Sequence, residues 1–124
     1  MKSLNMGSAY YRLTLDEVDR KIEKEKIGNY ALGYLQDRED GRRVFTVCYV
    51  GRSDTDLKRR IKEHIGENPK YQFFKYSYAS SSKDAYYKEC NNWHDFGGPE
   101  GLLNNSIHPD KPEGTNWKCQ QCGE

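Results

Sequence analysis

The distribution of hydrophobic and polar positions along this chain predicts three β-strands. Residues 28–35 (GNYALGYL) and 44–51 (VFTVCYVG) are rich in β-branched and aromatic side chains, which favour strands. The polar stretch between them contains Asp-Gly at 40–41, a dipeptide typical of hairpin turns, so we expect these two strands to pair. The third strand is predicted over 71–79 (YQFFKYSYA).

Three helices are expected around these strands. The first covers 15–26 after a Thr-x-x-Glu capping box, the second covers about 56–66, and the third covers 81–94. From 96 onward glycine, proline and asparagine dominate, and regular structure should fade. The order hairpin, helix, strand, helix predicts an α+β fold with a three-stranded, mostly antiparallel sheet flanked by helices.

The helix over 56–66 separates its two adjacent arginines. Its buried stripe consists of Leu57, Ile61 and Ile65. Arg60 and His64 stack one turn apart along the edge of that stripe, whereas Arg59 falls on the opposite side. We therefore expect Arg60 and His64 to lean toward the sheet. The alternative is that Arg60 extends its charge back to water and His64 is an ordinary buried histidine.

Two strand tyrosines bear on this choice. Tyr30 lies in the first strand and Tyr49 lies at the end of the second, so the hairpin could place them side by side. They would then converge with Arg60 and His64 near one face of the sheet. A single strand tyrosine is more often a core residue than a catalytic one. Only the combination of two tyrosines with an arginine and a histidine indicates a functional site.

Three short stretches together resemble the signature of the GIY-YIG nuclease family. They are GNY at 28–30, YVG at 49–51 and LKRRIKEH at 57–64. The resemblance implies that the two tyrosine strands pair, that Arg60 and His64 belong to the active site, and that a glutamate on a later helix binds a divalent metal. That glutamate matches Glu89.

Glu89 also has an unusual position for a charged residue on the helix predicted over 81–94. It shares the apolar face with Ala85 and Trp93, and an unpaired buried carboxylate is costly, so it needs a cation or a metal ion. The alternative to metal binding is a structural ion pair with Arg60 or a lysine.

The resemblance implies metal-dependent hydrolysis of phosphodiester bonds. Glu89 would hold Mg²⁺ or Mn²⁺, and Arg60 would bind a non-bridging phosphate oxygen. Tyr30 or Tyr49 would act as the general base, and His64 would bind a tyrosine hydroxyl or relay its proton. The choice between the two tyrosines stays open.

Further residues could contact the phosphate backbone without sequence preference. Four of them surround the predicted site: Arg52, Lys58, Arg59 and Lys62. The alternative is a solvated face, which fits Arg59 equally well. The resemblance adds Asn104, or its neighbour Asn105, as the match to an asparagine that follows the last helix in the family.

The C-terminal region predicts a zinc site. Cys119 and Cys122 form a Cys-x-x-Cys knuckle, and Cys90 and His94 stand one helical turn apart, which together give a Cys3His set. His108 is the rival fourth ligand. The alternative is that the knuckle cysteines are loose thiols. Cys48, in the middle of a strand, is expected in the core.

The net charge and the distribution of apolar residues limit the classes of function that we expect for this protein. The net charge is +1, so only local patches could bind nucleic acid. There is no apolar run typical of a signal peptide or a membrane span, so we expect an intracellular, cytoplasmic protein without a membrane partner, in which cysteines are thiols or metal ligands.

We divide the chain into an N-terminal segment with a short helix (1–27), a GIY-YIG-like nuclease core (28–105) and a zinc-knuckle extension (106–124). The function that we expect is that of a DNA endonuclease. Its small surface favours a branched, damaged or single-stranded substrate, or a partner subunit. The alternatives are a non-catalytic nucleic-acid-binding module and a zinc-bearing protein-interaction domain.

Overall fold

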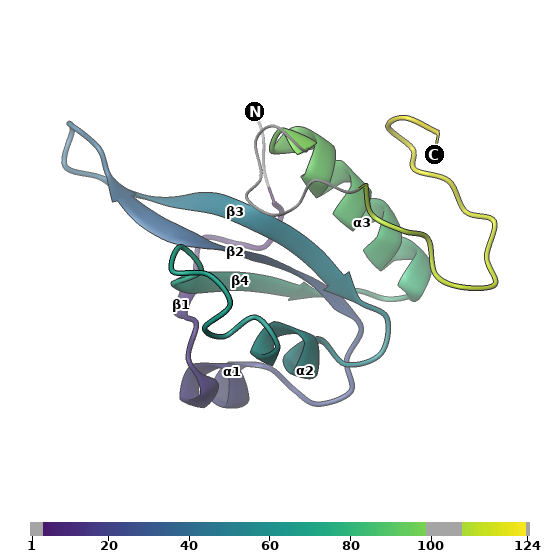
Figure 1. Ribbon diagram of the computed structural model, residues 1–124, viewed down its shortest axis with the longest axis horizontal. Coiled ribbons are helices and arrows are strands. Elements are labelled where there is room, and N and C mark those ends of the chain that lie inside the picture. The colour runs from purple at the N-terminus through teal and green to yellow at the C-terminus, as the bar shows by residue number, and fades with distance from the viewer. Residues whose placement is uncertain (1–3, 99–107, 124) are drawn as a thin grey trace.

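The computed structural model describes residues 4–98 and 108–123 and has an α+β fold (Figure 1). An antiparallel sheet has the strand order β1-β4-β2-β3. The strands are β1 (Tyr11–Arg12), β2 (Gly28–Asp37), β3 (Arg43–Ser53) and β4 (Phe73–Tyr78). The helices are α1 (Leu15–Lys21), α2 (Leu57–Lys62) and α3 (Ser82–Asp95).

The predicted hairpin is confirmed. β2 and β3 pair along their whole lengths, from Gly28 opposite Ser53 to Asp37 opposite Arg43. β4 pairs with the other side of β2. β3 therefore forms one edge of the sheet among the described strands.

The predicted strand count of three is wrong, because the sheet has four strands within the described residues. The extra strand, β1, has only two residues and pairs Tyr11 with Phe74. Two residues are too few to produce a periodic pattern, so the sequence gives no sign of it. The first helix also ends earlier than expected, at Lys21, because Ile22 turns to an extended conformation and is 2% exposed in the core.

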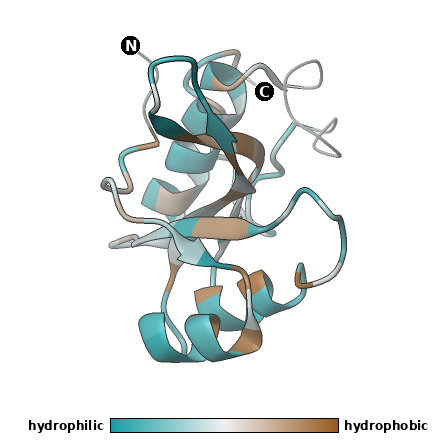
Figure 2. Ribbon diagram, turned by 90° about the vertical axis from the view of Figure 1, so that its left-hand side faces the viewer, coloured by the Kyte–Doolittle hydropathy of each residue, from teal (hydrophilic) through white to brown (hydrophobic). Residues whose placement is uncertain are grey.

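The helices cover both faces of the sheet (Figure 1). On one face Tyr30 and Leu32 pack with Leu57 and Ile61 of α2. On the other face Ala31 and Val50 pack with Trp93 of α3. The two faces follow from the alternation of side chains along a strand. Figure 2 shows the hydrophobic stretches concentrated along the strands.

The tail over residues 108–123 returns along α3 (Figure 1). Cys119 is 2% exposed and packs with Tyr86 and Cys90 of that helix. The contact between Cys119 and Cys90 brings together the two parts of the predicted zinc site, one in the tail and one in α3. Within the described ranges, no helix combines the length and the apolar character needed to cross a membrane.

Candidate active site and metal centre

A hydrogen-bonded chain of three side chains links β2 to the segment after α2. The hydroxyl of Tyr30 lies 2.7 Å from Nε2 of His64, and Nδ1 of His64 lies 3.0 Å from Oε1 of Glu67. Burial lowers the pKa of His64, although Glu67 acts in the opposite direction. In neutral His64, Nδ1–H donates to Glu67 and Nε2 accepts from Tyr30. Glu67 was not predicted from the sequence, where its only signal is its position three residues after His64.

Tyr49 and Arg60 complete this group. The ring centroids of Tyr49 and His64 lie 4.8 Å apart, and those of Tyr30 and Tyr49 lie 6.1 Å apart. Arg60 has a side chain 43% exposed and donates to Glu63 at 2.6 Å. The structure thus brings together the four residues that the helix and hairpin patterns predicted to converge, namely Tyr30, Tyr49, Arg60 and His64.

The pKa values of both phenols rise because the rings are buried. For Tyr30 the pKa lies well above 10, and for Tyr49 it is also raised. The positive charge of Arg60 lowers the pKa of each phenol but does not offset burial. Neither tyrosine is therefore an effective base without further positive charge nearby.

Each of the two tyrosine motifs requires its one glycine, because other groups approach the backbone closely at that position. A Cβ on Gly51 would lie 2.5 Å from the ring and hydroxyl of Tyr30. A Cβ on Gly28 would lie 2.7 Å from Cδ2 of Leu57 and also clash with the carbonyl of Ser77. These contacts give a packing reason for the G-x-Y and Y-x-G patterns.

Glu89 lies on α3, on the other face of the sheet from Tyr30. Its Oε1 accepts from Nη1 of Arg52 at 2.5 Å, and Nε of Arg52 donates to Oδ1 of Asp54 at 3.1 Å. Burial raises the pKa of Glu89 to about 7 in spite of Arg52. The charge of Glu89 in turn raises the pKa of Tyr30 and Tyr49, although burial has the larger effect.

Of the four basic residues expected to contact phosphates, only Arg59 is exposed. Arg52 is held by Glu89 and Asp54. Lys58 donates to the carbonyl of Asp19 at 3.1 Å, and Lys62 forms an ion pair with the Asp19 carboxylate. Asn104 and Asn105 lie outside the described residues.

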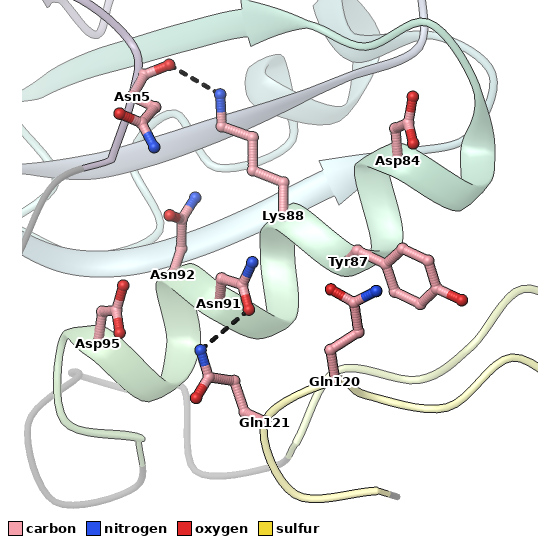
Figure 3. A pocket seen from close by; sticks show the side chains of 9 residues that line it. All are labelled: Asn5, Asp84, Tyr87, Lys88, Asn91, Asn92, Asp95, Gln120 and Gln121. Carbon is pink, nitrogen blue, oxygen red and sulfur yellow. Dashed lines mark hydrogen bonds between the residues drawn. The ribbon is translucent and has the colours of Figure 1, made fainter.

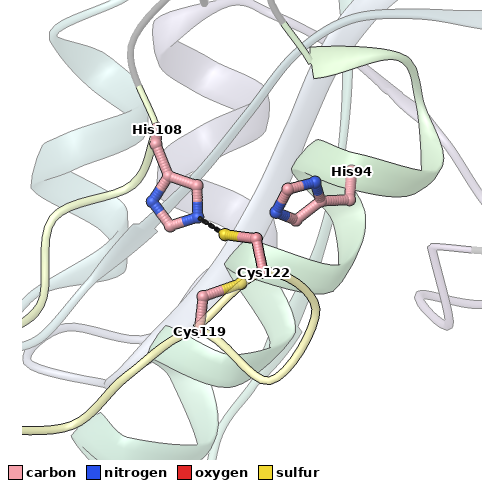
Figure 4. A group of neighbouring side chains, drawn as sticks. All are labelled: His94, His108, Cys119 and Cys122. Carbon is pink, nitrogen blue, oxygen red and sulfur yellow. Dashed lines mark hydrogen bonds between the residues drawn. The ribbon is translucent and has the colours of Figure 1, made fainter. Parts of the chain in front are cut away.

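A second cluster forms where α3 meets the tail (Figure 4). Its four side chains offer ligand atoms that all lie within 4.8 Å of one another: His94, His108, Cys119 and Cys122. Two imidazoles and two thiolates are a common ligand set for tetrahedral metal sites. These residues could hold a metal ion.

The hydrogen bonds around the cluster leave ligand atoms available. Nδ1–H of His108 donates to the carbonyl of Pro109 at 2.9 Å, which directs Nε2 toward Sγ of Cys122 at 3.4 Å. Nε2 of His94 is buried and has no hydrogen-bond partner among the described residues. A fixed tautomer and an unpaired ring nitrogen both suit metal ligation.

Cys119 has the properties of a thiolate. Burial acts to raise its pKa, but backbone N–H groups of Cys122 and Gln121, the side chain of His108 and that of Cys90 lower it to about 6. Such amide donors stabilise a sulfur that carries negative charge.

The cluster differs from the expected set at one position, because it contains His108 and not Cys90. Cys90 is 0% exposed and packs between Tyr86 and Cys119. Burial raises the pKa of Cys90 to about 12, which favours a neutral thiol. Helical spacing placed Cys90 one turn from His94, but α3 directs it into the core. The other buried thiol, Cys48, lies in the core as expected.

No protein-family model, curated protein or solved structure matches this chain.

Proposed function

We propose that this protein is a divalent-metal-dependent endonuclease that hydrolyses phosphodiester bonds of DNA by GIY-YIG-type chemistry. The observation that supports this most is the hydrogen bond between Tyr30 and His64, with Tyr49 and Arg60 beside it. A phenol, an imidazole and a guanidinium at one place match the needs of phosphoryl transfer, namely proton removal and charge stabilisation.

Within this proposal Arg60 contacts the scissile phosphate. Its side chain is 43% exposed, so a DNA strand can reach it, and it donates to the exposed Glu63. A phosphate oxygen would replace Glu63 as the partner. The planar fork of arginine then stabilises the negative charge that builds up on the phosphoryl oxygens.

The exposures of the two tyrosines favour different roles. Tyr30 is 0% exposed, whereas Tyr49 is only partly buried. Only a hydroxyl that reaches the surface can take a proton from an attacking water. Tyr49 is thus the better candidate for the general base, and Tyr30 beside it donates a hydrogen bond to Nε2 of His64.

Glu89 is the residue that would hold Mg²⁺ or Mn²⁺. Its carboxylate is buried, and burial raises its pKa to about 7 although Arg52 and Arg60 lower it. A hard divalent cation prefers oxygen ligands and would supply that charge. When bound, the cation would lower the pKa of a water bound to it, and its charge would oppose that of Glu89, which raises the pKa of Tyr30 and Tyr49.

The second metal in the proposal is zinc, held by His94, His108, Cys119 and Cys122. Mixed imidazole and thiolate ligands favour zinc over magnesium, which prefers oxygen. All four positions are filled by protein, so the site is structural. Its role is to hold the tail against α3, because the tail has few apolar residues with which to pack.

The substrate in this proposal is branched, damaged or single-stranded DNA, or DNA presented by a partner subunit. Lys58 and Lys62 contact Asp19, which leaves Arg59 as the exposed cation among the four expected near the site. A short, distorted or unpaired stretch needs fewer phosphate contacts.

One observation favours a second candidate function, a non-catalytic nucleic-acid-binding module. Arg52 contacts Glu89 at 2.5 Å, and both side chains are nearly buried. In a purely structural bridge, this ion pair would satisfy Glu89 without any metal.

A metal-dependent nicking assay separates the two candidates. We expect the purified protein to convert supercoiled or branched DNA in the presence of Mg²⁺ or Mn²⁺, and Glu89→Gln to abolish the reaction while the protein remains folded. Tyr49→Phe should also abolish it, whereas Tyr10→Phe, at an exposed tyrosine, should not. Cleavage by Glu89→Gln at the wild-type rate would reject the metal role, and no cleavage with any divalent metal would favour the binding module.

A further inference from the structure

A polar groove lies along α3, bounded by the N-terminal segment on one side and by the tail on the other (Figure 3). Its volume is about 500 Å³. Asn5 belongs to the first wall, Gln120 and Gln121 belong to the second, and Asn91 and Asn92 rise from the helix between them. The groove is separate from the tyrosine site, which lies on the other face of the sheet.

Asn92, which lines the groove, carries an unsatisfied hydrogen-bond donor. The residue is 3% exposed, and its Nδ2 is buried without a hydrogen-bond partner among the described residues. A buried amide donor that is left unsatisfied is destabilising, and such groups in native structures call for an explanation. A bound molecule with an acceptor atom would supply the missing partner.

The groove's other groups restrict what that molecule can be. Asp84 and Asp95 also line it, and their carboxylates disfavour a phosphate. The ammonium of Lys88 is already bound by the carbonyl of Asn5 and the hydroxyl of Ser77, each at 2.8 Å. What remains is a set of side-chain amides, each with a donor and an acceptor, beside carboxylates that only accept.

A nucleobase fits these requirements. Its edge is uncharged and presents donors and acceptors in one plane, which amides and carboxylates can match. An exocyclic amino group, as on cytosine, adenine or guanine, would donate to an aspartate. The volume of about 500 Å³ lies in the range of small-molecule sites and holds one nucleotide.

Aromatic and cationic groups continue from the groove toward the tail. Tyr87 lines the groove, and Lys83 lies over two rings, 5.8 Å from the centroid of Tyr87 and 5.9 Å from that of Trp117. Aromatic faces stack on bases, and a nearby lysine can bind the connecting phosphate, which is the arrangement that proteins use for unpaired strands.

We propose that this groove binds one unpaired nucleobase that carries an exocyclic amino group, from a single-stranded segment of nucleic acid. The proposal rests on the proposed function only in taking DNA as the ligand. Gln120 and Gln121 lie between the knuckle cysteines, and Nε2 of Gln121 donates to Oδ1 of Asn91 at 3.1 Å. The metal centre therefore positions one wall of the groove.

The test measures binding in the absence of cleavage. Zinc-loaded protein with Glu89→Gln, in buffer without Mg²⁺, is titrated with short homopolymers of deoxycytidine and of thymidine and with an abasic strand of the same length. We expect the deoxycytidine strand to bind most tightly and to shift the side-chain amide NMR signals of Asn92 and Gln121. Asn92→Leu should weaken its binding about tenfold, and Gln121→Ala should weaken it severalfold.

Asn116→Ala is the matched control, because Asn116 is an exposed tail amide that does not line the groove. Equal affinity for the abasic strand would mean phosphate contact alone and would overturn the proposal. Unchanged binding by Asn92→Leu, an equal loss in Asn116→Ala, or no binding of any strand would overturn it too. A base-dependent loss in Asn92→Leu supports the groove even if the wild type proves unable to cleave DNA.

Discussion

The phenolic oxygen of Tyr30 lies 2.7 Å from Nε2 of His64, and the two residues are 0% and 3% exposed. The hydrogen bond joins residues 34 positions apart, one in β2 and one just after α2. It therefore ties the second helix to the sheet as well as connecting a phenol to an imidazole. Stability and activity should both depend on this pair.

The first prediction concerns the coupling between these two residues. Tyr30→Phe and His64→Leu each leave one buried polar group without its partner, which costs about 1–3 kcal/mol of unfolding free energy. The double variant removes both groups and should cost less than the sum of the single losses, by about 1 kcal/mol. Urea unfolding of the four proteins measures this difference, and strictly additive losses would contradict it.

The second prediction is a pH dependence of stability. Burial lowers the pKa of His64 and the charge of Arg60 adds to this, while Glu67 and Glu63 oppose it. The folded protein thus binds this proton less tightly than the unfolded chain. The stability contributed by neutral His64 is present above the unfolded pKa of about 6.5 and is lost as the pH falls below it.

His64→Leu provides the comparison for this effect. Unfolding free energies measured between about pH 8 and pH 5 should fall more steeply toward acid in the wild type than in the variant. Other groups that titrate in this range, including Glu89, are present in both proteins and cancel in the difference. Parallel pH profiles would show that His64 does not have a lowered pKa.

The third prediction concerns Gly51. A methyl group there would lie 2.5 Å from the ring of Tyr30, so Gly51→Ala should lower the unfolding free energy by about 1–3 kcal/mol through overpacking. Tyr30→Leu shortens the opposing side chain, so adding Gly51→Ala to that variant should cost less. Chemical denaturation measures both effects. An equal cost in the two backgrounds would show that the strain arises elsewhere.

Local patterns predicted the elements that define the tyrosine site. The hairpin formed as expected, and the helical periodicity separated the arginines correctly, since Arg59 is exposed and Arg60 is half-buried. Periodicity was less useful for side-chain partners. Glu63, for example, meets Arg60 at 2.6 Å, because residues three positions apart are neighbours on a helix and long side chains bend toward one another.

Long-range pairing was not accessible from local patterns. Arg52 was expected to contact phosphates, but it binds Glu89, 37 residues away on the facing helix. His108 was considered only as a rival ligand, yet it joins His94 in one cluster. Neither outcome leaves a periodic trace in the sequence, since each depends on how α3 packs against the sheet and on the path of the tail.

The fourth prediction identifies the ligands of the metal centre. Elemental analysis should find one zinc ion per chain in protein purified without added metal. His94→Ala, His108→Ala and the double variant Cys119→Ser/Cys122→Ser should each lose it, because a four-coordinate structural site needs all its ligands. Cys90→Ala is the control and should retain zinc, since Cys90 lies outside the cluster. Loss of zinc in Cys90→Ala with retention in His108→Ala would assign the fourth ligand to Cys90.

The fifth prediction uses the adjacent arginines as a matched pair. Arg60 acts on the pKa of both site phenols, whereas Arg59 is exposed on the outer side of α2. If Arg60 contacts the scissile phosphate, Arg60→Ala should lower the single-turnover cleavage rate about a hundredfold, or by about 3 kcal/mol. Arg60→Lys should fail as well, because an ammonium cannot reproduce the two-pronged contact of a guanidinium.

Arg59→Ala should behave differently from both Arg60 variants. Its effect should appear in DNA affinity, not in the cleavage rate, and should shrink as the salt concentration rises, because an exposed cation contributes only a screened phosphate contact. Single-turnover cleavage of nicked or branched DNA by the three variants, at low and high salt, measures this contrast. An inactive Arg59→Ala beside an active Arg60→Ala would mean that the opposite face of α2 meets the DNA. The hydrogen bond between Tyr30 and His64 would then serve only to hold that helix on the sheet.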